Sequence, residues 1–461
     1  MERRVLAKRK TEHTTVTLTQ SKGQTDLALL RLHNVAKWDS HLKFNNLLHH
    51  LSIENLTRAY SALNRKAAIG IDEQSWESYG ENLHENISTL HTLLHTNRYK
   101  PQPTKRVWIP KSQGQQRPIG ITAVEDKVVQ QALVWVLEQI YEADFLGFSY
   151  GFRPKRNQHQ ALDVVYIALT QKKVSWVLDA DIQGFFDNID HDWMIKFIEH
   201  RISDKRVLSL LKKMLRAGVI EEGEWSKTRI GTPQGAVISP LLANIYLHYV
   251  LDLWVHQWRK RYARGEVYIV RYADDFVMGF QYKSDAEHFQ NALVERLKQF
   301  GLKLHPEKTR LIEFGRFAES NRKTRGVSKP EGFDFLGFTH LCSNKRNDKG
   351  FTVRRQTISK RLRNKVKKIK EHMKKIRMLN VHQQGSWLRK VMHGLINYYG
   401  IPGNNKALAT LRTEMCCHWR KSLRRRGNKR PINWVHMTKL IERWIPKVRI
   451  VHPYPNQRRS V

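Results

Sequence analysis

The sequence predicts an α+β protein in which strands that carry carboxylates are followed by strongly basic helices. Two stretches rich in β-branched and aromatic residues, at 174–182 and 267–280, have the composition of buried strands. Other stretches repeat apolar residues every three or four positions, which indicates helices. From residue 345 to residue 461 the chain has 32 Lys and Arg against 4 Asp and Glu, so the charge is concentrated in its last quarter.

The composition indicates a folded protein with a polyanionic partner. The 461 residues carry a net charge of +39, and the 13 Trp, 15 Tyr and 17 Phe suffice for packed cores. This charge excludes an ordinary acidic-to-neutral metabolic enzyme. It favours a nucleic acid over an acidic membrane surface, because no separate amphipathic anchor or lipidation motif is present. With only three Cys, a disulfide framework is excluded and a reducing compartment is favoured.

The first 142 residues predict a helical region and a hairpin. Residues 1–34 are polar, and we expect a flexible tail there, whereas the apolar spacing of 35–100 predicts helices. Prolines between residues 101 and 110 exclude a helix in the next segment. The expected elements are strands near 104–110 and 117–121, joined by a turn at Ser112-Gln113-Gly114, and a helix over 125–142.

Three carboxylates are the main chemical signal. Asp181 ends the strand at 174–182, and Asp274 with Asp275 interrupts the apolar stretch at 267–280, which predicts a hairpin with both acids at its tight turn. Adjacent strand ends can bring these acids together, and such a cluster repels itself unless cations neutralise it. Carboxylate oxygens favour Mg²⁺, and a pair of such ions is the arrangement for in-line phosphoryl transfer. Asp179 shares the strand face of Asp181 and is an alternative ligand.

The C-terminal quarter predicts three amphipathic helices. Apolar residues from Ile358 to Ile376 recur at steps of three and four, and ten Lys or Arg occupy the other faces between Lys360 and Arg377. Similar periods span 387–398 and 408–423. The aromatic residues of these helices fall mostly on core-facing positions, although stacking on bases is an alternative. A basic helical module that binds nucleic acid is therefore expected, and its candidate contacts are Lys360, Arg361, Arg363, Lys367, Lys368, Arg424, Arg425 and Arg426.

Six ordered boxes resemble those of reverse transcriptases encoded by group II introns. Tyr272-Ala273-Asp274-Asp275 is similar to the YADD box of reverse transcriptases, and a match of six boxes in order is far more specific than YADD alone. The boxes are RPIGI at 117–121, DADIQGFFD at 179–187, TPQGAVISPLLANIYLH at 232–248, RYADDF at 271–276, LHPEKT at 304–309 and FDFLGF at 333–338.

The resemblance implies a right-hand polymerase with fingers, an antiparallel-sheet palm and a helical thumb, followed by a helical basic maturase domain. The expected division of the chain is a tail at 1–34, a helical N-terminal extension at 35–100, a fingers and palm domain at 101–345, a thumb and maturase RNA-binding domain at 346–430, and a basic C-terminal segment at 431–461.

The resemblance also implies roles for single residues. Asp181, Asp274 and Asp275 take the positions that hold two Mg²⁺ ions. Ala236 departs from the commoner TPQGG form, and its methyl should fit if its backbone is not left-handed. The residues expected around the incoming nucleotide are Lys111, Arg117, Phe186, Gln234 and Lys308, and Phe335, Leu336 and Gly337 resemble the primer grip.

Phe186 lies five residues after Asp181, where a bulky ring can crowd a ribose 2′-OH and favour deoxynucleotides. Core packing of the Phe185-Phe186 pair is the alternative, and the sequence leaves open which ring faces the sugar. By contrast, Asp187, Asp190 and His191 are better interpreted as residues at the start of a helix.

The resemblance implies RNA-directed DNA synthesis, together with binding of the chain's own intron RNA and help in splicing and mobility. The partners would be intron RNA, an RNA template with a DNA primer, and dNTPs, in a cytoplasmic ribonucleoprotein of bacterial type with no membrane partner. No endonuclease module is expected. The alternatives are an RNA-binding splicing factor with an idle polymerase site, a reverse transcriptase recruited to host defence or repair, and an RNA-copying RNA polymerase, which Phe186 and YADD disfavour.

Overall fold

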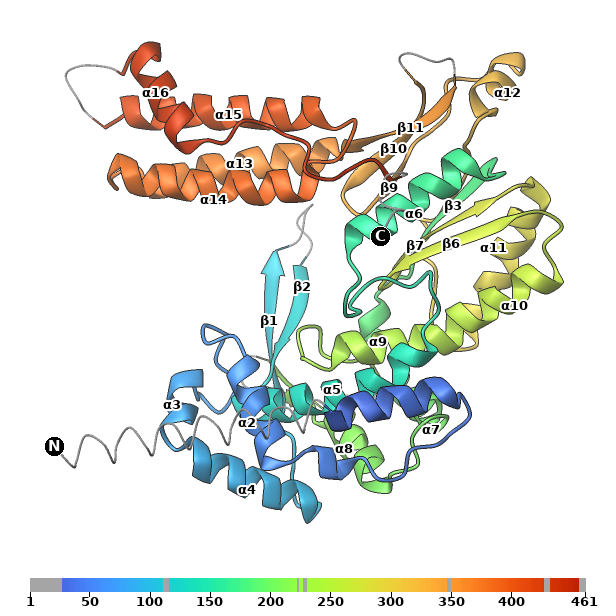
Figure 1. Ribbon diagram of the computed structural model, residues 1–461, viewed down its shortest axis with the longest axis vertical. Coiled ribbons are helices and arrows are strands. Elements are labelled where there is room, and N and C mark those ends of the chain that lie inside the picture. Colours follow the sequence, from blue (N-terminus) through green and yellow to red (C-terminus); the bar gives the residue numbers. More distant parts are fainter. Residues whose placement is uncertain are drawn as a thin grey trace.

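The computed structural model describes residues 27–110, 116–221, 224–226, 230–345, 350–426 and 432–455. It is a mixed helix and sheet structure, which confirms the predicted α+β class. Figure 1 shows helices at the bottom, sheets in the middle and a group of long helices at the top.

The N-terminal part of the described chain is helical. Residues 27–38 form a helix that buries Leu29 and Ala36, so the helical region begins before the predicted residue 35. Residues 1–26 of the predicted tail lie outside the described residues. The helices that follow are η1 (Leu48–His50), α2 (Ile53–Ala62), α3 (Trp76–Glu81) and α4 (Leu83–His95).

A hairpin extends from these helices toward the upper part of the molecule (Figure 1). Strand β1 (Thr104–Pro110) pairs antiparallel with β2 (Gln116–Ile121), which confirms the two predicted strands. The predicted turn at Ser112-Gln113-Gly114 lies outside the described residues. The sheet has the order β2-β1-β4-β5, and it is completed by β4 (Val219–Glu221) and β5 (Glu224–Ser226).

The central sheet, called here the acidic sheet, has the antiparallel order β6-β7-β3-β8. It confirms the strand predicted at 174–182 and the hairpin predicted at 267–280. Its strands are β3 (Trp176–Asp181), β6 (Val267–Tyr272), β7 (Asp275–Phe280) and β8 (Arg310–Glu313).

Both faces of the acidic sheet are covered by helices. The alternation of side chains sends Leu178 into the core shared with α11 (Lys283–Lys298), and Val177 into the core shared with α6 (Gln158–Gln171). Because both faces are buried, the strands consist mainly of apolar residues until they reach the carboxylates.

Further helices surround the core beneath the acidic sheet. The long α5 (Val124–Asp144), predicted over 125–142, is buried along most of its length. Asp190 caps α7 by accepting a hydrogen bond from the Trp193 backbone, as expected for a residue that begins a helix. The other elements here are η3 (Phe185–Asp187), α7 (His191–Glu199), α8 (Lys205–Arg216), α9 (Ser239–Leu247), η4 (His248–Asp252) and α10 (Leu253–Arg261).

A third sheet connects the acidic sheet to the C-terminal helices. Its order is β11-β10-β9, and its strands are β9 (Phe333–Phe335), β10 (Phe338–Asn344) and β11 (Phe351–Thr357), with α12 (Ala318–Thr324) before them. The three predicted basic helices follow as α13 (Ser359–Lys375), α14 (Val381–Tyr399) and α15 (Asn405–Arg424), and a fourth helix, α16 (Trp434–Trp444), packs on α14.

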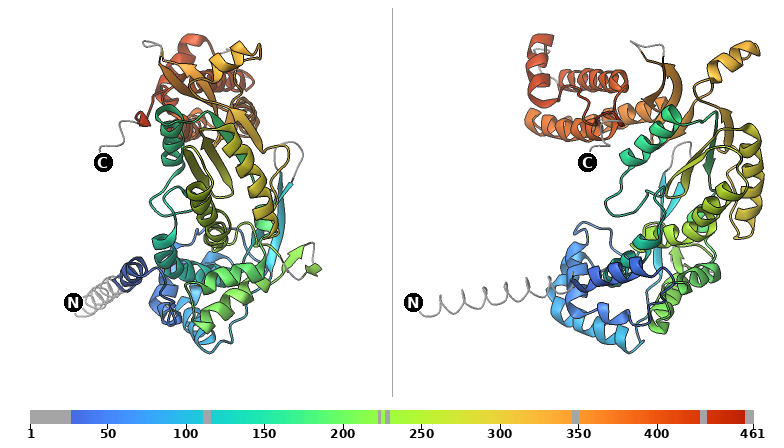
Figure 2. Two further views of the ribbon diagram at one scale, coloured as in Figure 1. Left: turned by 90° about the vertical axis from the view of Figure 1, so that its right-hand side faces the viewer. Right: turned by 45° about the vertical axis from the view of Figure 1, so that its right-hand side comes forward.

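The C-terminal helices share a core with one face of the acidic sheet. Trp419 and Leu388 belong to the same buried cluster as Val177 and Val277. Figure 2 shows the helices extending outward from the sheets. Within the described ranges, none of the helices combines the length and the apolar character needed to cross a bilayer.

Candidate active site

The strand register places the predicted acids side by side. Asp181 on β3 is the direct cross-strand partner of Asp275 on β7, and Asp274 precedes Asp275 in the turn of the β6–β7 hairpin. Directly opposed residues of antiparallel strands have Cα atoms about 4.5–5.5 Å apart and side chains on the same face. The three carboxylates therefore form one acidic cluster, although 93 residues separate Asp181 from Asp274.

The turn that carries Asp274 has a strained backbone. Ala273 has φ +58°, whereas Asp274 does not have a positive φ, which is the pattern of a two-residue II′ turn. Gly151 packs directly against this turn, since a Cβ at residue 151 would come within 2.3 Å of the Ala273 nitrogen. The segment around Gly151 thus holds the turn in place.

A buried ion pair also supports the turn, and the sequence analysis missed it. The guanidinium of Arg271 donates to both carboxylate oxygens of Asp252 at 2.7 and 2.5 Å, and both side chains are fully buried. Arg271 Nη1 also donates to the Ala273 carbonyl and to Asn244 Oδ1, each at 3.0 Å. A charged residue in an otherwise apolar strand was the available signal for Arg271.

The pKa values of Asp274 and Asp275 are higher than those of ordinary surface carboxylates. Burial raises the pKa of Asp275 well above its usual range, and the nearby Asp179, Asp181 and Asp274 raise it further. Burial also raises the pKa of Asp274, with Asp181 adding to the effect and Arg117 and Lys308 opposing it. Such mutual repulsion favours cations at this site.

Lys308 is one cation that the fold supplies to the cluster. The backbone N–H of His305 donates to the Asp181 carbonyl at 2.8 Å, which aligns the LHPEKT segment with the end of β3. The ammonium group of Lys308 then forms an ion pair with the Asp181 carboxylate. The carboxylate of Asp179 instead forms an ion pair with the guanidinium of Arg310, with Oδ2 and Nη2 3.7 Å apart.

The donor set suits a hard divalent cation, because it consists of carboxylate oxygens on one face of a sheet. In the part of the chain that the structure describes, no three His, Cys, Asp or Glu side chains are already arranged around a single metal position. The Asp181 carboxylate is paired with the Lys308 ammonium, so a metal ion bound there would have to replace that partner.

The predicted nucleotide-binding residues approach the acidic cluster from two other segments. Arg117 on β2 donates through Nε to Gln234 Oε1 at 2.5 Å, and the Gly120 N–H donates to the Gln234 carbonyl at 2.7 Å. The TPQG segment is therefore attached to the β1–β2 hairpin. Ala236 does not have a positive φ, so its methyl fits as expected. Lys111 lies outside the described residues.

Phe185 and Phe186 are both buried beside the acidic cluster. Their exposed fractions are 2% and 8%, and their rings meet edge to face with centroids 5.4 Å apart. Both rings therefore contribute to the core. Which ring faces a nucleotide sugar stays a prediction.

The FDFLGF segment forms a second tight turn. Phe335 pairs with Phe338, and the two residues between them, Leu336 and Gly337, have φ of +46° and +87°. Positive φ at both central positions is the pattern of a type I′ turn. Leu336 is under strain in this conformation, so neighbouring contacts must hold the turn.

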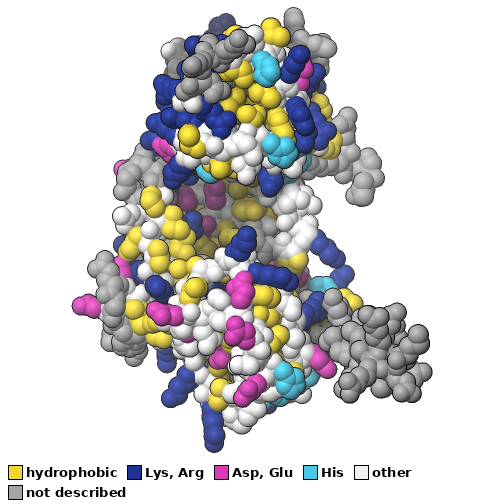
Figure 3. Space-filling model, turned by 90° about the vertical axis from the view of Figure 1, so that its left-hand side faces the viewer, with side chains coloured by type: hydrophobic (Ala, Val, Ile, Leu, Met, Phe, Trp, Pro, Cys, Tyr) yellow, Lys and Arg dark blue, Asp and Glu magenta, His cyan; other side chains and the backbone are white. Residues whose placement is uncertain are grey.

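Basic side chains form two further surfaces. The predicted RNA contacts on α13 are exposed, as are Arg424 and Arg425, whereas Arg426 is half-buried and donates to the Leu379 carbonyl. Figure 3 shows Lys and Arg gathered on the upper helices, with Asp and Glu visible in the hollow below them.

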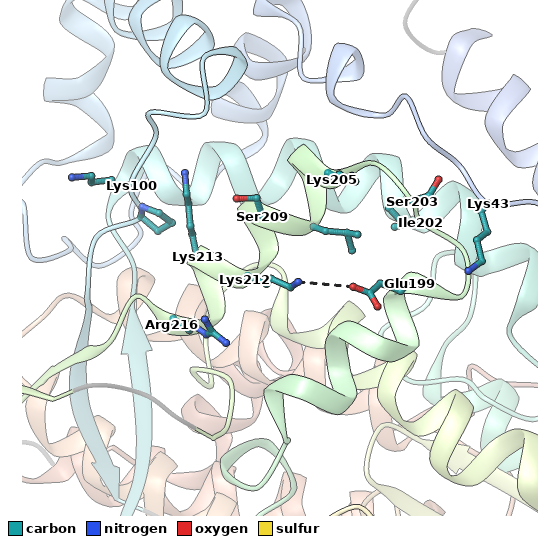
Figure 4. Close-up of a pocket in the computed structure, with 12 residues that line it drawn as sticks. Lys43, Lys100, Glu199, Ile202, Ser203, Lys205, Ser209, Lys212, Lys213 and Arg216 are labelled. Atoms are coloured by element: carbon teal, nitrogen blue, oxygen red, sulfur yellow. Dashed lines mark ion pairs between the residues drawn. The ribbon is translucent and has the colours of Figure 1, made fainter.

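The second basic surface is a groove of about 1010 Å³ along α8. Figure 4 shows Lys212 in this groove, paired with Glu199 at 3.9 Å. The other cationic side chains of the groove come from α8 and from two segments before it, and they are Lys43, Lys100, Lys205, Lys213 and Arg216.

Comparison with known sequences decides the family. The family model described as reverse transcriptase (RNA-dependent DNA polymerase) matches residues 109–340, half of the chain, including Asp181, Asp274 and Asp275. This chain belongs to the reverse transcriptase family. The reverse transcriptase is also similar to protein YkfC of Escherichia coli K12, with 33% identity over 315 residues that cover 61% of this chain and 77% of YkfC.

Other relatives have names that refer to introns. The group II intron-encoded protein LtrA of Lactococcus lactis is 40% identical over 196 residues, which cover 42% of this reverse transcriptase and 32% of LtrA. Nuclear intron maturase 2 of Arabidopsis thaliana is 32% identical over 112 residues, covering 23% of this chain and 15% of that protein. These matches confirm the resemblance to group II intron reverse transcriptases.

Proposed function

We propose that this reverse transcriptase is encoded by a group II intron, copies RNA into DNA, and binds its intron RNA to assist splicing and mobility. The observation that carries the proposal is the β3–β7 register, which places Asp181 beside Asp275 and next to Asp274 in a chain of this family. The relatives named as intron proteins support the intron part of the proposal. The protein would act as a ribonucleoprotein.

In this proposal the molecule is a right-hand polymerase. The acidic sheet corresponds to the palm, the β1–β2 hairpin to the fingertips, and helices α13–α15 to the thumb and maturase region. The shared core in which Trp419 and Val177 are buried means that the thumb and palm stabilise each other. For this reason, truncation near residue 350 would expose that core and is a poor test of RNA binding.

Asp181 and Asp274 would be the direct ligands of Mg²⁺, with Asp275 completing the site. Two such ions, when bound, would stabilise the negative charge on the attacking oxygen of the primer and on the departing pyrophosphate. The chain's own residues position the substrates. Arg117 and Lys308 face the acidic cluster, where their charges would stabilise the triphosphate, and Gln234 would lie against the nucleotide.

The activity is tested by extension of a DNA primer on an RNA template with dNTPs, together with measurement of binding to the intron RNA encoded around this reading frame. We expect both extension and tight intron binding. Intron binding without extension would instead support a splicing factor with an idle polymerase site. Extension without preference for the intron RNA would contradict the intron assignment.

Phe186→Val should weaken discrimination against ribonucleotides. If the Phe186 ring crowds the 2′-OH, a smaller side chain admits the hydroxyl, and the ratio of kcat/KM for dNTP over rNTP should fall about tenfold or more. The measurement is single-nucleotide incorporation with matched dNTP and rNTP. The control is Phe185→Val, which creates a similar cavity in the same core. If Phe185→Val lowers the ratio and Phe186→Val does not, the assignment moves to Phe185.

Neutralising the exposed face of α13 should weaken intron RNA binding and reduce its dependence on salt. Replacing Lys360, Arg363, Lys367 and Lys368 with Gln removes cations that would each release about 0.7–0.9 counterions from RNA. The slope of log Kd against log salt should therefore become shallower by about 3. A matched control replaces four exposed lysines elsewhere with Gln, namely Lys37, Lys260, Lys298 and Lys323. Equal slopes in the two variants would show that α13 does not contact phosphate.

A further inference from the structure

The TPQG segment is held by α5 as well as by the β1–β2 hairpin. The Gln130 side chain of α5 accepts hydrogen bonds through Oε1 from the backbone N–H groups of Val237, at 2.9 Å, and of Ile238, at 3.4 Å. Gln130 is only 5% exposed and lies on a helix whose buried side chains are mainly apolar. A buried amide is costly unless it is hydrogen-bonded, so these two bonds fix the side chain and the backbone to each other.

The two attachments lie at opposite ends of a short stretch of chain. The Gly120 N–H donates to the Gln234 carbonyl at 2.7 Å, and the bond from Val237 to Gln130 comes three residues later. Between them, Gly235 has φ of +116°, and a Cβ there would lie 2.8 Å from the Gly120 carbonyl oxygen. Glycine permits this close approach but gives the backbone wide conformational freedom. The position of Gln234 therefore depends on both attachments.

Helix α5 is itself anchored one turn before Gln130. The Asp126 carboxylate accepts hydrogen bonds from the Tyr99 hydroxyl and, at 3.1 Å, from the Gln102 N–H. Asp126 and Gln130 line the same small internal cavity as Pro233 of the TPQG segment. Because α5 is buried along most of its length, it forms a firm support behind that segment.

We propose that Gln130 is a positioning residue that holds Gln234 against the incoming nucleotide and so lowers the KM for dNTP. This inference rests on the proposed polymerase function and on the assignment of Gln234 to the nucleotide site. Gln130 is buried and acts through the backbone at Val237, so it does not contact the substrate itself. A segment that is ordered before the nucleotide arrives costs less to fix on binding, which favours binding. The chemical step at the acidic cluster should be little affected.

Gln130→Leu tests this role, because it keeps the bulk of the side chain and removes the acceptor of both N–H groups. We expect the KM for dNTP to rise about five- to tenfold, as for the loss of one or two hydrogen bonds, while kcat stays near wild type. Gln130→Glu retains an acceptor oxygen at the same place and should recover most of the affinity. If Gln130→Leu does not fold, Gln130→Asn replaces it, since its shorter side chain cannot reach both N–H groups. Single-nucleotide incorporation over a range of dNTP concentrations measures both constants.

A double-variant cycle tests whether Gln130 acts through Gln234. Gln234→Ala should raise the KM for dNTP, and adding Gln130→Leu should cause little further rise, because the side chain that Gln130 positions is then missing. Two controls should leave the KM unchanged. Gln131→Leu alters the half-buried neighbour of Gln130 on α5, and Asn55→Leu removes a fully buried amide that donates to the His50 carbonyl in the N-terminal helices.

Equal rises in KM from Gln130→Leu with and without the Gln234 side chain would overturn the proposal, as would a wild-type KM in Gln130→Leu. A similar rise in Asn55→Leu would also overturn it, because lost stability would then explain the effect. Failure of the wild type to extend a primer would instead refute the polymerase function itself, so the two failures are distinguishable.

Discussion

Asp274→Asn is expected to abolish dNTP incorporation on an RNA template, with a loss of about 1000-fold or more, while intron RNA affinity stays near wild type. The amide has nearly the shape of the carboxylate but lacks its charge, so a divalent cation loses a ligand. Because burial and Asp181 raise the pKa of Asp274, the fold disfavours the charged form, and the neutral Asn should not destabilise the protein. Incorporation of labelled dNTP, thermal unfolding and RNA binding are measured together.

Asp192→Asn is the matched control for this variant. The Asp192 side chain is 84% exposed and lies on α7, away from the acidic sheet, so extension should be unchanged. Retained extension in Asp274→Asn would remove the metal-ligand assignment. A parallel loss of RNA affinity or of the folding transition would show that the substitution acts on the structure.

Arg271→Met is expected to lower the free energy of unfolding by about 3–5 kcal/mol, because it leaves the Asp252 carboxylate buried without its partner. It also removes the donor to the Ala273 carbonyl, so the turn that carries Asp274 loses support. Urea unfolding measures the first effect, and primer extension on folded protein measures the second. Lys283→Met, which breaks an exposed ion pair with Glu287, should change stability by less than about 1 kcal/mol.

A double variant separates folding from positioning. Arg271→Met with Asp252→Leu leaves no unpaired charge, so it should recover most of the lost stability. Extension should stay low, because the Ala273 carbonyl still lacks its donor. Full recovery of extension in the double variant would mean that Arg271 acts on the fold alone and not on the turn.

Local patterns predicted the elements of the site well. The strands at 104–110 and 174–182, the hairpin at 267–280 and the three C-terminal helices follow from apolar periodicity and turn residues, which depend on near neighbours in the chain. The convergence of Asp181 with Asp275 was also predictable, since a strand ending in an acid and a hairpin with acids at its turn meet naturally at a sheet edge. That inference drew on the ordered boxes as well.

The sequence did not predict the contacts between residues that are far apart in the chain. Nothing local indicates that Arg271 meets Asp252 inside a π-helical segment, or that Tyr398 on α14 holds the turn at Leu336, 62 residues away. For the same reason the predicted division placed the C-terminal helices in a different domain from the strand at 174–182, although Trp419 and Val177 share a core. The helix at 27–38 was missed because its buried residues, Leu29 and Ala36, are few beside exposed Leu27 and Leu30.

Metal-directed cleavage of the chain is the most direct measurement of whether Asp181, Asp274 and Asp275 hold a divalent cation together. Fe²⁺ substituted for Mg²⁺, with ascorbate and peroxide, produces radicals that cut the backbone nearest the bound ion. We expect cuts near residue 181 and near residues 274–275, both suppressed by excess Mg²⁺ and both lost in Asp274→Asn. Cuts at one segment without the other, or cuts that persist in excess Mg²⁺, would contradict a shared site.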